Sequence, residues 1–275
     1  MSTIINFCPT GMIPTKKMTP HVPVTPQEII EQVHEAYELG ITIVHLHARE
    51  KDETPSSSKN IYREIFEGVR RHCPQLVICG STSGRNFHEF EKRSEVIELR
   101  PDMCSLTLSS LNFFQSASLN APDMIRQLAQ KMNDFGVKPE MECFDLGMIN
   151  YGKYLIAKNI IKGPYYWNLL FGNIAGFQPD FAHIGVALAG LQGEEHYIAL
   201  GGLGESQLKI NAMAIANGYG IRIGLEDNTW FDKNRQQKAT NISLLKRAHQ
   251  LMAIHETSLM TSVEFGKKGF YNEQD

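Results

Sequence analysis

Apolar positions along this chain follow two alternating patterns, which together predict eight strand–helix units. Short apolar runs predict strands at 4–8, 41–47, 76–79, 103–108, 138–144, 165–171, 197–200 and 221–226. Residues at helical spacing predict helices at 26–39, 58–72, 87–99, 122–135, 146–158, 179–190, 205–217 and 241–254. This alternation implies a parallel sheet, and eight units suit a single (β/α)8 TIM barrel over residues 1–275. A doubly wound open sheet is the alternative.

The first helix has a complete start and stop signal. Thr25 is suited to be its N-cap, Pro26 to be its first residue, and Glu28 to close a capping box with Thr25. Gly40 follows the last apolar position and is suited to end the helix.

Composition excludes several classes of function. The net charge is −3 with an ordinary charged fraction of 21%, which does not suit binding to nucleic acid or to acidic lipid. The chain has no apolar run of 18 residues and no basic start followed by an apolar stretch, so we expect a soluble cytoplasmic protein without a membrane partner. Its five cysteines include no CxxC pair, which favours buried thiols in a reducing compartment over a cysteine metal cluster.

Two histidines at the end of the second predicted strand are the leading candidates for chemistry. His45 and His47 are two residues apart, so in a strand they point to the same face, roughly 7 Å apart along the chain. Imidazoles at that spacing can converge on one ion, since Zn–N bonds are about 2.0–2.1 Å. The alternative is an ordinary strand end with one packed and one exposed histidine.

A carboxylate on the last strand strengthens the metal interpretation. Active sites of such barrels lie at the C-terminal strand ends, and the eighth strand neighbours the first in a closed barrel. Glu226 can therefore join His45 and His47 in a two-histidine, one-carboxylate set that leaves open positions for water or substrate. The ligand types favour zinc over manganese or cobalt. The alternative is a buried ion pair between Arg222 and Glu226 that only fills the barrel.

Further polar residues share these strand ends: Ser81, Ser105, Thr107, Glu140, Glu142, Arg222 and Asp227. Glu142 could instead make only structural hydrogen bonds, and Ser81 and Thr107 could cap the following helices. Four other histidines fall on helical patterns and are expected at the surface or in packing: His34, His72, His88 and His249. His183 and His196 are not assigned.

Several motifs together resemble one family, the β-keto acid cleavage enzymes, over essentially the whole chain. They are CPTGMIPTKK and VPVTPQEI near the start, then HLHARE, GST, PEMECFD and RIGLEDN, in the family's order. The resemblance implies a zinc-dependent (β/α)8 barrel, usually a homotetramer. Such an enzyme combines a β-keto acid with acetyl-CoA as co-substrate, and releases acetoacetate and a new acyl-CoA by a retro-Claisen route.

The resemblance also assigns roles to residues. It implies that His45, His47 and Glu226 bind the metal, and that Arg222 and Asp227 form a dyad linked to substrate deprotonation. The substrate would be lined by Ser81, Glu142, Thr10, Ile13 and a hydroxyl at either Ser105 or Thr107.

One position departs from the member that cleaves 3-keto-5-aminohexanoate. An acidic residue after the first strand's TG pair meets the substrate amine in that enzyme, whereas here Thr10-Gly11 is followed by Met12 and Ile13. An aliphatic wall disfavours a bare ammonium, which would lose its hydration without compensation. We therefore expect no preference for the aminohexanoate, and an uncharged or apolar acyl tail.

Two other functions compete with this interpretation. Metal-dependent hydrolases of the amidohydrolase type also carry HxH on such a barrel, but usually on the first strand, with further histidines on strands five and six. Here HxH is on the second strand, and the fifth ends in Glu142-Cys143-Phe144 without a histidine. A binding protein on an inactive barrel is the alternative that is not an enzyme.

Overall fold

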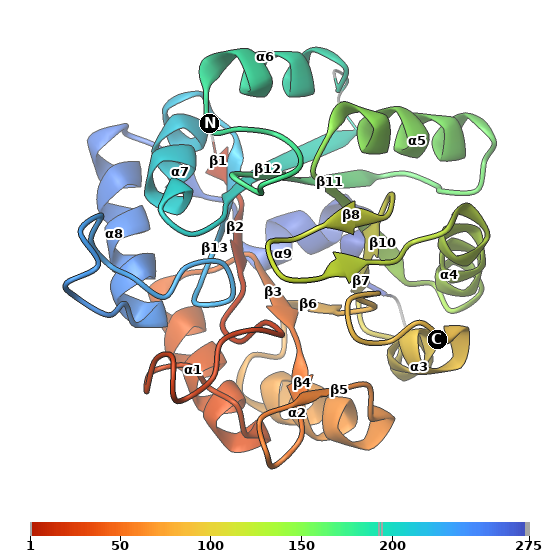
Figure 1. Cartoon of the computed structure of the whole chain (residues 1–275), viewed down its shortest axis with the longest axis horizontal. Coiled ribbons are helices and arrows are strands. Elements are labelled where there is room, and N and C mark those ends of the chain that lie inside the picture. Colours follow the sequence, from red (N-terminus) through yellow and green to blue (C-terminus); the bar gives the residue numbers. More distant parts are fainter. Residues whose placement is uncertain (1, 192, 194, 273–275) are drawn as a thin grey trace.

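Eight parallel strands form a closed barrel in this computed structural model, which describes residues 2–191, 193 and 195–272. In order around the barrel they are β2 (Ile5–Phe7), β3 (Ile43–Leu46), β6 (Val77–Gly80), β7 (Met103–Thr107), β10 (Lys138–Cys143), β11 (Tyr165–Phe171), β12 (His196–Gly202) and β13 (Gly220–Ile223). Pairing of β13 with β2 closes the ring, which confirms the predicted (β/α)8 barrel and excludes the open sheet (Figure 1).

Helices surround the barrel close to their predicted positions (Figure 1). They are α1 (Pro26–Leu39), α2 (Lys59–His72), α4 (Pro122–Asp134), α5 (Leu146–Ala157), α6 (Phe181–Ala189), α7 (Ser206–Ala216) and α8 (Asn241–Ile254). The helix predicted at 87–99 is shorter, with α3 (Phe90–Ser94) continued by a 3-10 segment, η1 (Glu95–Leu99). Within α3, Arg93 is buried and donates to the backbone carbonyls of Thr82 and Leu119.

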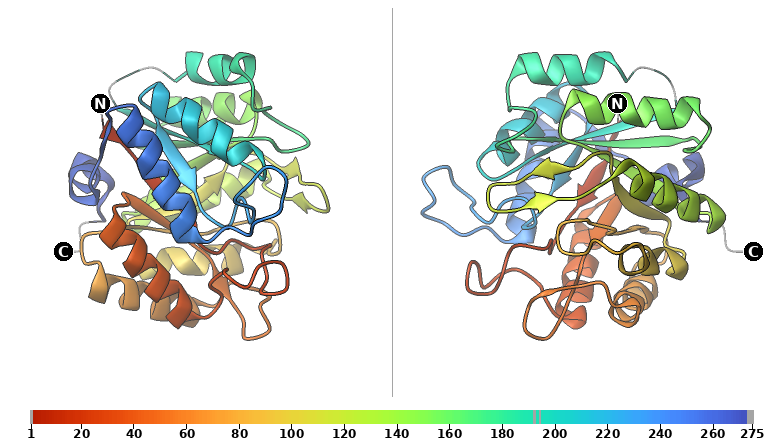
Figure 2. Two further views of the ribbon diagram at one scale, coloured as in Figure 1. Left: turned by 90° about the vertical axis from the view of Figure 1, so that its left-hand side faces the viewer. Right: turned by 45° about the vertical axis from the view of Figure 1, so that its right-hand side comes forward.

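Two hairpins that the sequence pattern did not predict stand at the C-terminal end of the barrel. They are β4 (Ala48–Arg49) with β5 (Pro55–Ser56), and β8 (Leu111–Asn112) with β9 (Ala117–Ser118). Figure 2 shows hairpin β8–β9 and the loops 8–25 and 226–240 projecting at this end, whereas α9 (Ser262–Phe265) lies at the opposite end. The projecting segments therefore build a rim around the C-terminal strand ends.

An aromatic plug closes the N-terminal end of the barrel. The pair β1 (Ser2–Thr3) and β14 (Ser258–Leu259) leads into α9 (Ser262–Phe265) and the π-helical turn η2 (Gly266–Phe270). The rings of Phe265 and Phe270 stack with centroids 4.0 Å apart, and the ring of Tyr166 meets both edge-on. Both phenylalanines are fully buried. The sequence pattern ended at residue 254 and did not predict this element.

The capping box predicted for α1 is confirmed. Thr25 Oγ1 accepts a hydrogen bond from Glu28 N, at 3.2 Å, and Glu28 Oε2 accepts one from Thr25 N, at 3.0 Å. Among the described residues, no helix combines the length and apolar character needed to span a membrane.

Removing one plug ring is expected to destabilise the whole barrel. Phe265→Ala should lower the free energy of unfolding by about 3–5 kcal/mol, because the cavity it leaves lies between Phe270 and the strand ends. Urea denaturation measures this, with the exposed Ile254→Ala as the matched control. A loss below about 1 kcal/mol would show that the plug is peripheral.

The capping carboxylate predicts a pH dependence of stability. Partial burial raises the pKa of Glu28, but hydrogen bonds from Lys16 and the backbone N–H groups of Val24 and Thr25 outweigh it and lower the pKa from 4.5 to about 2. Because the pKa falls on folding, the stabilisation is present above pH 4.5 and is lost as the pH falls toward 2.

Glu28→Gln should therefore cost up to about 1 kcal/mol at pH 7, since the pair with Lys16 is partly exposed. The difference from the parent should shrink below pH 4.5. Denaturation at several pH values measures it, with the exposed Glu35→Gln as control. A difference that stays constant with pH would contradict the role of the charge.

Candidate active site

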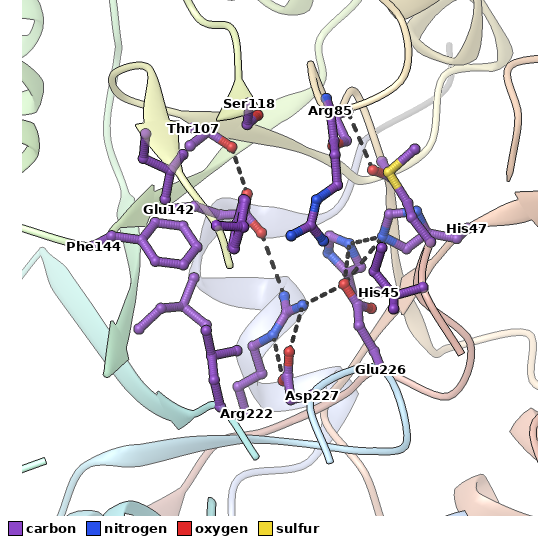
Figure 3. Close-up of a pocket in the computed structure, with 18 residues that line it drawn as sticks. His45, His47, Arg85, Thr107, Ser118, Glu142, Phe144, Arg222, Glu226 and Asp227 are labelled. Atoms are coloured by element: carbon purple, nitrogen blue, oxygen red, sulfur yellow. Dashed lines mark hydrogen bonds and ion pairs between the residues drawn. The ribbon is translucent and has the colours of Figure 1, made fainter. Parts of the chain in front are cut away.

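A cavity of about 230 Å³ lies at the C-terminal strand ends, inside the rim of loops. His45 and His47 face Glu226 on one side of it, and Arg222 reaches in beside Asp227 (Figure 3). This volume is below the 300–1,000 Å³ that is typical for drug-sized ligands, so the cavity suits a small molecule.

Three side chains converge with the geometry of a metal site. His45 Nε2 lies 3.1 Å from His47 Nε2, and Glu226 Oε1 lies 3.2 Å from His47 Nε2 and 4.0 Å from His45 Nε2. Two nitrogens bound to one tetrahedral zinc would be roughly 3.3 Å apart, given Zn–N bonds of about 2.0–2.1 Å. In the described part of the chain, Glu226 Oε2 is buried and has no hydrogen-bond partner. The three residues therefore fit a zinc ion.

Glu226 reaches this position from a turn, because β13 ends at Ile223 and does not extend to 226 as predicted. Two glycines make the turn feasible. Gly224 has φ +155°, and a Cβ there would lie 2.0 Å from the carbonyl oxygen of Cys8. Gly11 has φ +65°, and a Cβ there would lie 2.5 Å from Glu226 Cγ. The glycine of the TG pair thus allows the loop after β2 to approach Glu226 closely.

The carboxylate of Glu140 orients the imidazole of His45 from deeper in the barrel. His45 Nδ1 lies 2.6 Å from Glu140 Oε2, and the amides of Asn6 and Asn168 donate to Glu140 Oε1. Burial lowers the pKa of His45, but the charges of Glu140 and Glu226 outweigh it and raise the pKa to about 9. A carboxylate behind a metal-binding histidine commonly fixes its tautomer and ring orientation. Glu140 was expected on this face from its place in the strand, but its contact with His45 was not predicted.

His45, Cys79 and Glu140 form a second cluster of candidate ligands, one layer deeper. Burial raises the pKa of the Cys79 thiol well above its usual value, and this thiol lies 3.1 Å from Glu140 Oε2. A neutral thiol that donates to Glu140 already explains these contacts, because metal ligation would require the thiolate. The outer cluster of His45, His47 and Glu226 is therefore the better metal candidate.

Arg222 is shared among three carboxylates at the cavity. Its Nε donates to Asp227 Oδ2 at 2.9 Å, its Nη2 donates to Glu226 Oε1 at 2.7 Å, and its Nη1 lies 3.4 Å from Glu142 Oε1 (Figure 3). Burial raises the pKa of Asp227 and of Glu142, although the charge of Arg222 opposes the shift in both. Asp227 and Glu142 are thus better proton acceptors than exposed carboxylates.

The two alternative hydroxyls differ in position. Thr107 lines the cavity, and its Oγ1 donates to Glu142 Oε2 at 2.7 Å. Ser105 lies one layer deeper and does not line the cavity; its Oγ accepts a hydrogen bond from Thr82 N. Ser81 also lines the cavity. Neither hydroxyl caps the helix that follows it. The N-cap of α3, which follows Ser81, is Glu89, and the N-cap of α4, which follows Thr107, is Ala121.

The residues of the loop after β2 also differ in whether they line the cavity. Ile13 is 47% exposed and lines the cavity, as does Met12. Thr10 is fully buried and does not line the cavity, and its hydroxyl has no hydrogen-bond partner among the described residues. Arg85, from the loop after β6, also points into the cavity (Figure 3). Arg85 was not predicted at the cavity from sequence, since a lone arginine in a loop follows no pattern.

The remaining histidines do not line the cavity. His196 Nδ1 accepts a hydrogen bond from Trp167 Nε1 at 2.9 Å, and His183 lies 2.8 Å from Asp180, so both unassigned histidines have local partners. The four expected at the surface or in packing are also outside it: His34, His72, His88 and His249.

Known proteins match this chain over most of its length. The sequence model of the beta-keto acid cleavage enzyme family matches residues 2–267. A 3-oxoadipate:acetyl-CoA acetyltransferase of Cupriavidus necator is 36% identical over 84% of this chain and 81% of its own. A 3-keto-5-aminohexanoate cleavage enzyme of Acetoanaerobium sticklandii is 33% identical over 86% of each chain.

Solved structures agree on the fold. A ternary complex of ObcA with a C4-CoA adduct and oxalate superposes with a TM-score of 0.76 at 18% identity, covering 90% of this chain and 67% of that one. At this identity the likeness concerns the barrel alone. The sequence match over residues 2–267 decides the family: the chain belongs to the β-keto acid cleavage enzymes.

Proposed function

We propose that this chain is a zinc-dependent enzyme that converts a β-keto acid and acetyl-CoA into acetoacetate and a new acyl-CoA. The observation that carries the proposal is the convergence of His45, His47 and Glu226 beside the Arg222–Asp227 pair. The name of the Cupriavidus necator relative supports acetyl-CoA as the co-substrate.

The proposed metal ligands are His45, His47 and Glu226. Zinc held there would keep open positions and would act as a Lewis acid on the keto group. The imidazole of His45 is held in place by Glu140, and Glu226 is held by Arg222 at 2.7 Å. These partners pre-orient His45 and Glu226 for binding.

Asp227 is the proposed base that removes a proton from C2 of the β-keto acid. Its pKa is raised by burial, which increases its capacity to accept a proton near neutral pH. Arg222 forms ion pairs with Glu226 and Glu142 as well as with Asp227. It therefore orients Asp227 but does not neutralise that carboxylate alone.

In the proposed reaction, C2 of the β-keto acid is the atom at which one carbon–carbon bond forms and another breaks. C2 forms a bond to the acetyl carbonyl carbon and the CoA thiolate leaves; the thiolate adds to C3, and the C2–C3 bond breaks. Acetoacetate takes up the proton that was removed from C2. The hydroxyl of Ser81 lines the cavity and is placed to donate to an oxygen that gains charge. The hydroxyl of Thr107 donates its proton to Glu142 Oε2 and so orients that carboxylate at the cavity wall.

Metal removal tests the proposal. The purified protein is incubated with acetyl-CoA and a panel of β-keto acids before and after chelation, and products are followed by mass spectrometry. We expect a new acyl-CoA and an equal amount of acetoacetate, abolished by the chelator and restored by zinc. Hydrolysis of amides or esters that depends on metal, without any CoA product, would instead favour a hydrolase.

Glu140→Gln tests how the proposed metal site is supported. We expect zinc affinity to fall about 10- to 100-fold, because His45 loses the carboxylate that orients it. Competition with a chromophoric chelator measures the affinity. Glu142→Gln is the matched control, since it changes a carboxylate on the same strand face that does not contact His45. Equal affinities in the two variants would contradict the role of Glu140.

A further inference from the structure

Arg85 differs from the other arginines near the cavity because, in the described part of the chain, its guanidinium has no hydrogen-bond acceptor. Arg49 and Arg93 each donate to three oxygens, and Arg222 pairs with four carboxylates. Within residues 2–191, 193 and 195–272, no acidic group forms an ion pair with Arg85, and its buried Nε has no hydrogen-bond partner. The terminal N–H groups of its guanidinium are thus available to a ligand.

The guanidinium of Arg85 is held over the cavity by an aromatic ring. Its central carbon lies 3.7 Å from the ring centroid of Phe113, in the hairpin region after β7. Figure 3 shows Arg85 entering from the side opposite Arg222, with its head group pointing toward the space between Glu142 and the histidines. An arginine stays charged even when burial lowers its pKa, as it does here. The nearby charge of Glu226 offsets only part of the cost of burying this cation, and no carboxylate forms an ion pair with it, so an anionic ligand would be favoured.

We propose that Arg85 binds a second carboxylate, at the far end of the acyl tail, and that the substrates are short β-keto dicarboxylic acids. This inference rests on the proposed function, because it takes the reacting keto acid group to lie at His45, His47 and Glu226. Arg85 thereby acts as a specificity-determining residue.

The walls of the cavity suit such a molecule. The cavity is also lined by the apolar side chains of Leu111, Phe144 and Leu170, which would contact methylene groups of the tail. The planar guanidinium can bind a carboxylate through two parallel hydrogen bonds. Arg85 would also repel an ammonium, in agreement with the aliphatic Ile13. The expectation of an uncharged tail, drawn from Ile13 alone, is replaced by an anionic one.

For a six-carbon dicarboxylate the reaction balances without another reactant. In 3-oxoadipate, the C2–C3 bond breaks and C2 bonds to the acetyl carbonyl carbon. The CoA sulfur moves from the acetyl group to C3. The products are acetoacetate and succinyl-CoA, and the distal carboxylate is unchanged throughout.

Three six-carbon acids with different tails test the inference on the zinc-loaded protein: 3-oxoadipate, 3-oxohexanoate and 3-keto-5-aminohexanoate. We expect kcat/KM for 3-oxoadipate to exceed that for 3-oxohexanoate by about 10- to 100-fold, the range typical of charge-assisted hydrogen bonds. Arg85→Gln should reduce this ratio at least tenfold, and Arg85→Lys should retain part of it. Arg126→Gln, which removes an exposed charge on α4, should leave the ratio unchanged.

Two outcomes would overturn the inference. One is a parent enzyme that prefers 3-oxohexanoate or 3-keto-5-aminohexanoate, a result that would not contradict the proposed function. The other is an equal loss for all three acids in Arg85→Gln, which would assign Arg85 to the reacting end.

Calorimetric binding of 3-oxoadipate without acetyl-CoA tests, separately from turnover, whether Arg85 binds the distal carboxylate. A tenfold or greater loss of affinity in Arg85→Gln, with no loss for 3-oxohexanoate, supports the inference even if no acyl-CoA forms and the proposed function fails. Equal affinities in parent and variant overturn it.

Discussion

Charge balance in the interior of the barrel is the constraint on which the site depends. Four carboxylates, Glu140, Glu142, Glu226 and Asp227, meet around the single guanidinium of Arg222, at distances up to 3.9 Å. Buried charges are tolerated only when they are paired and hydrogen-bonded. The carboxylates outnumber the cation that they share. A proton on His45, a bound divalent metal or an arginine such as Arg85 would each reduce the excess negative charge.

The features predicted correctly from sequence are those that depend on local periodicity. His45 and His47 were expected on one face because side chains alternate along a strand, and the structure brings their Nε2 atoms within 3.1 Å. The capping box of Thr25 and Glu28 depends on four consecutive residues, so it could be identified without tertiary information. Eight repeated strand–helix units were sufficient to predict the barrel.

The features that sequence could not supply depend on contacts between distant segments. Whether Ser105 or Thr107 reaches the cavity depends on depth in the barrel, which the alternation of side chains leaves open. The role of Glu140 requires the register of β10 against its neighbours, with His45 arriving from β3. Arg85 has significance only because hairpin β8–β9 carries Phe113 beneath it, and that hairpin follows no strong pattern.

The position of the aromatic plug near the end of the sequence affects the order in which the barrel can fold. Ser2 pairs with Ser258, and Phe265 and Phe270 cover strand ends that come from almost every part of the chain. Contacts at such separation form slowly, because the intervening chain loses entropy before they contribute any stability. During synthesis all eight strands emerge before the segment that seals them. The N-terminal end of the barrel is therefore an exposed apolar surface in the nascent protein, and aggregation through this surface competes with folding.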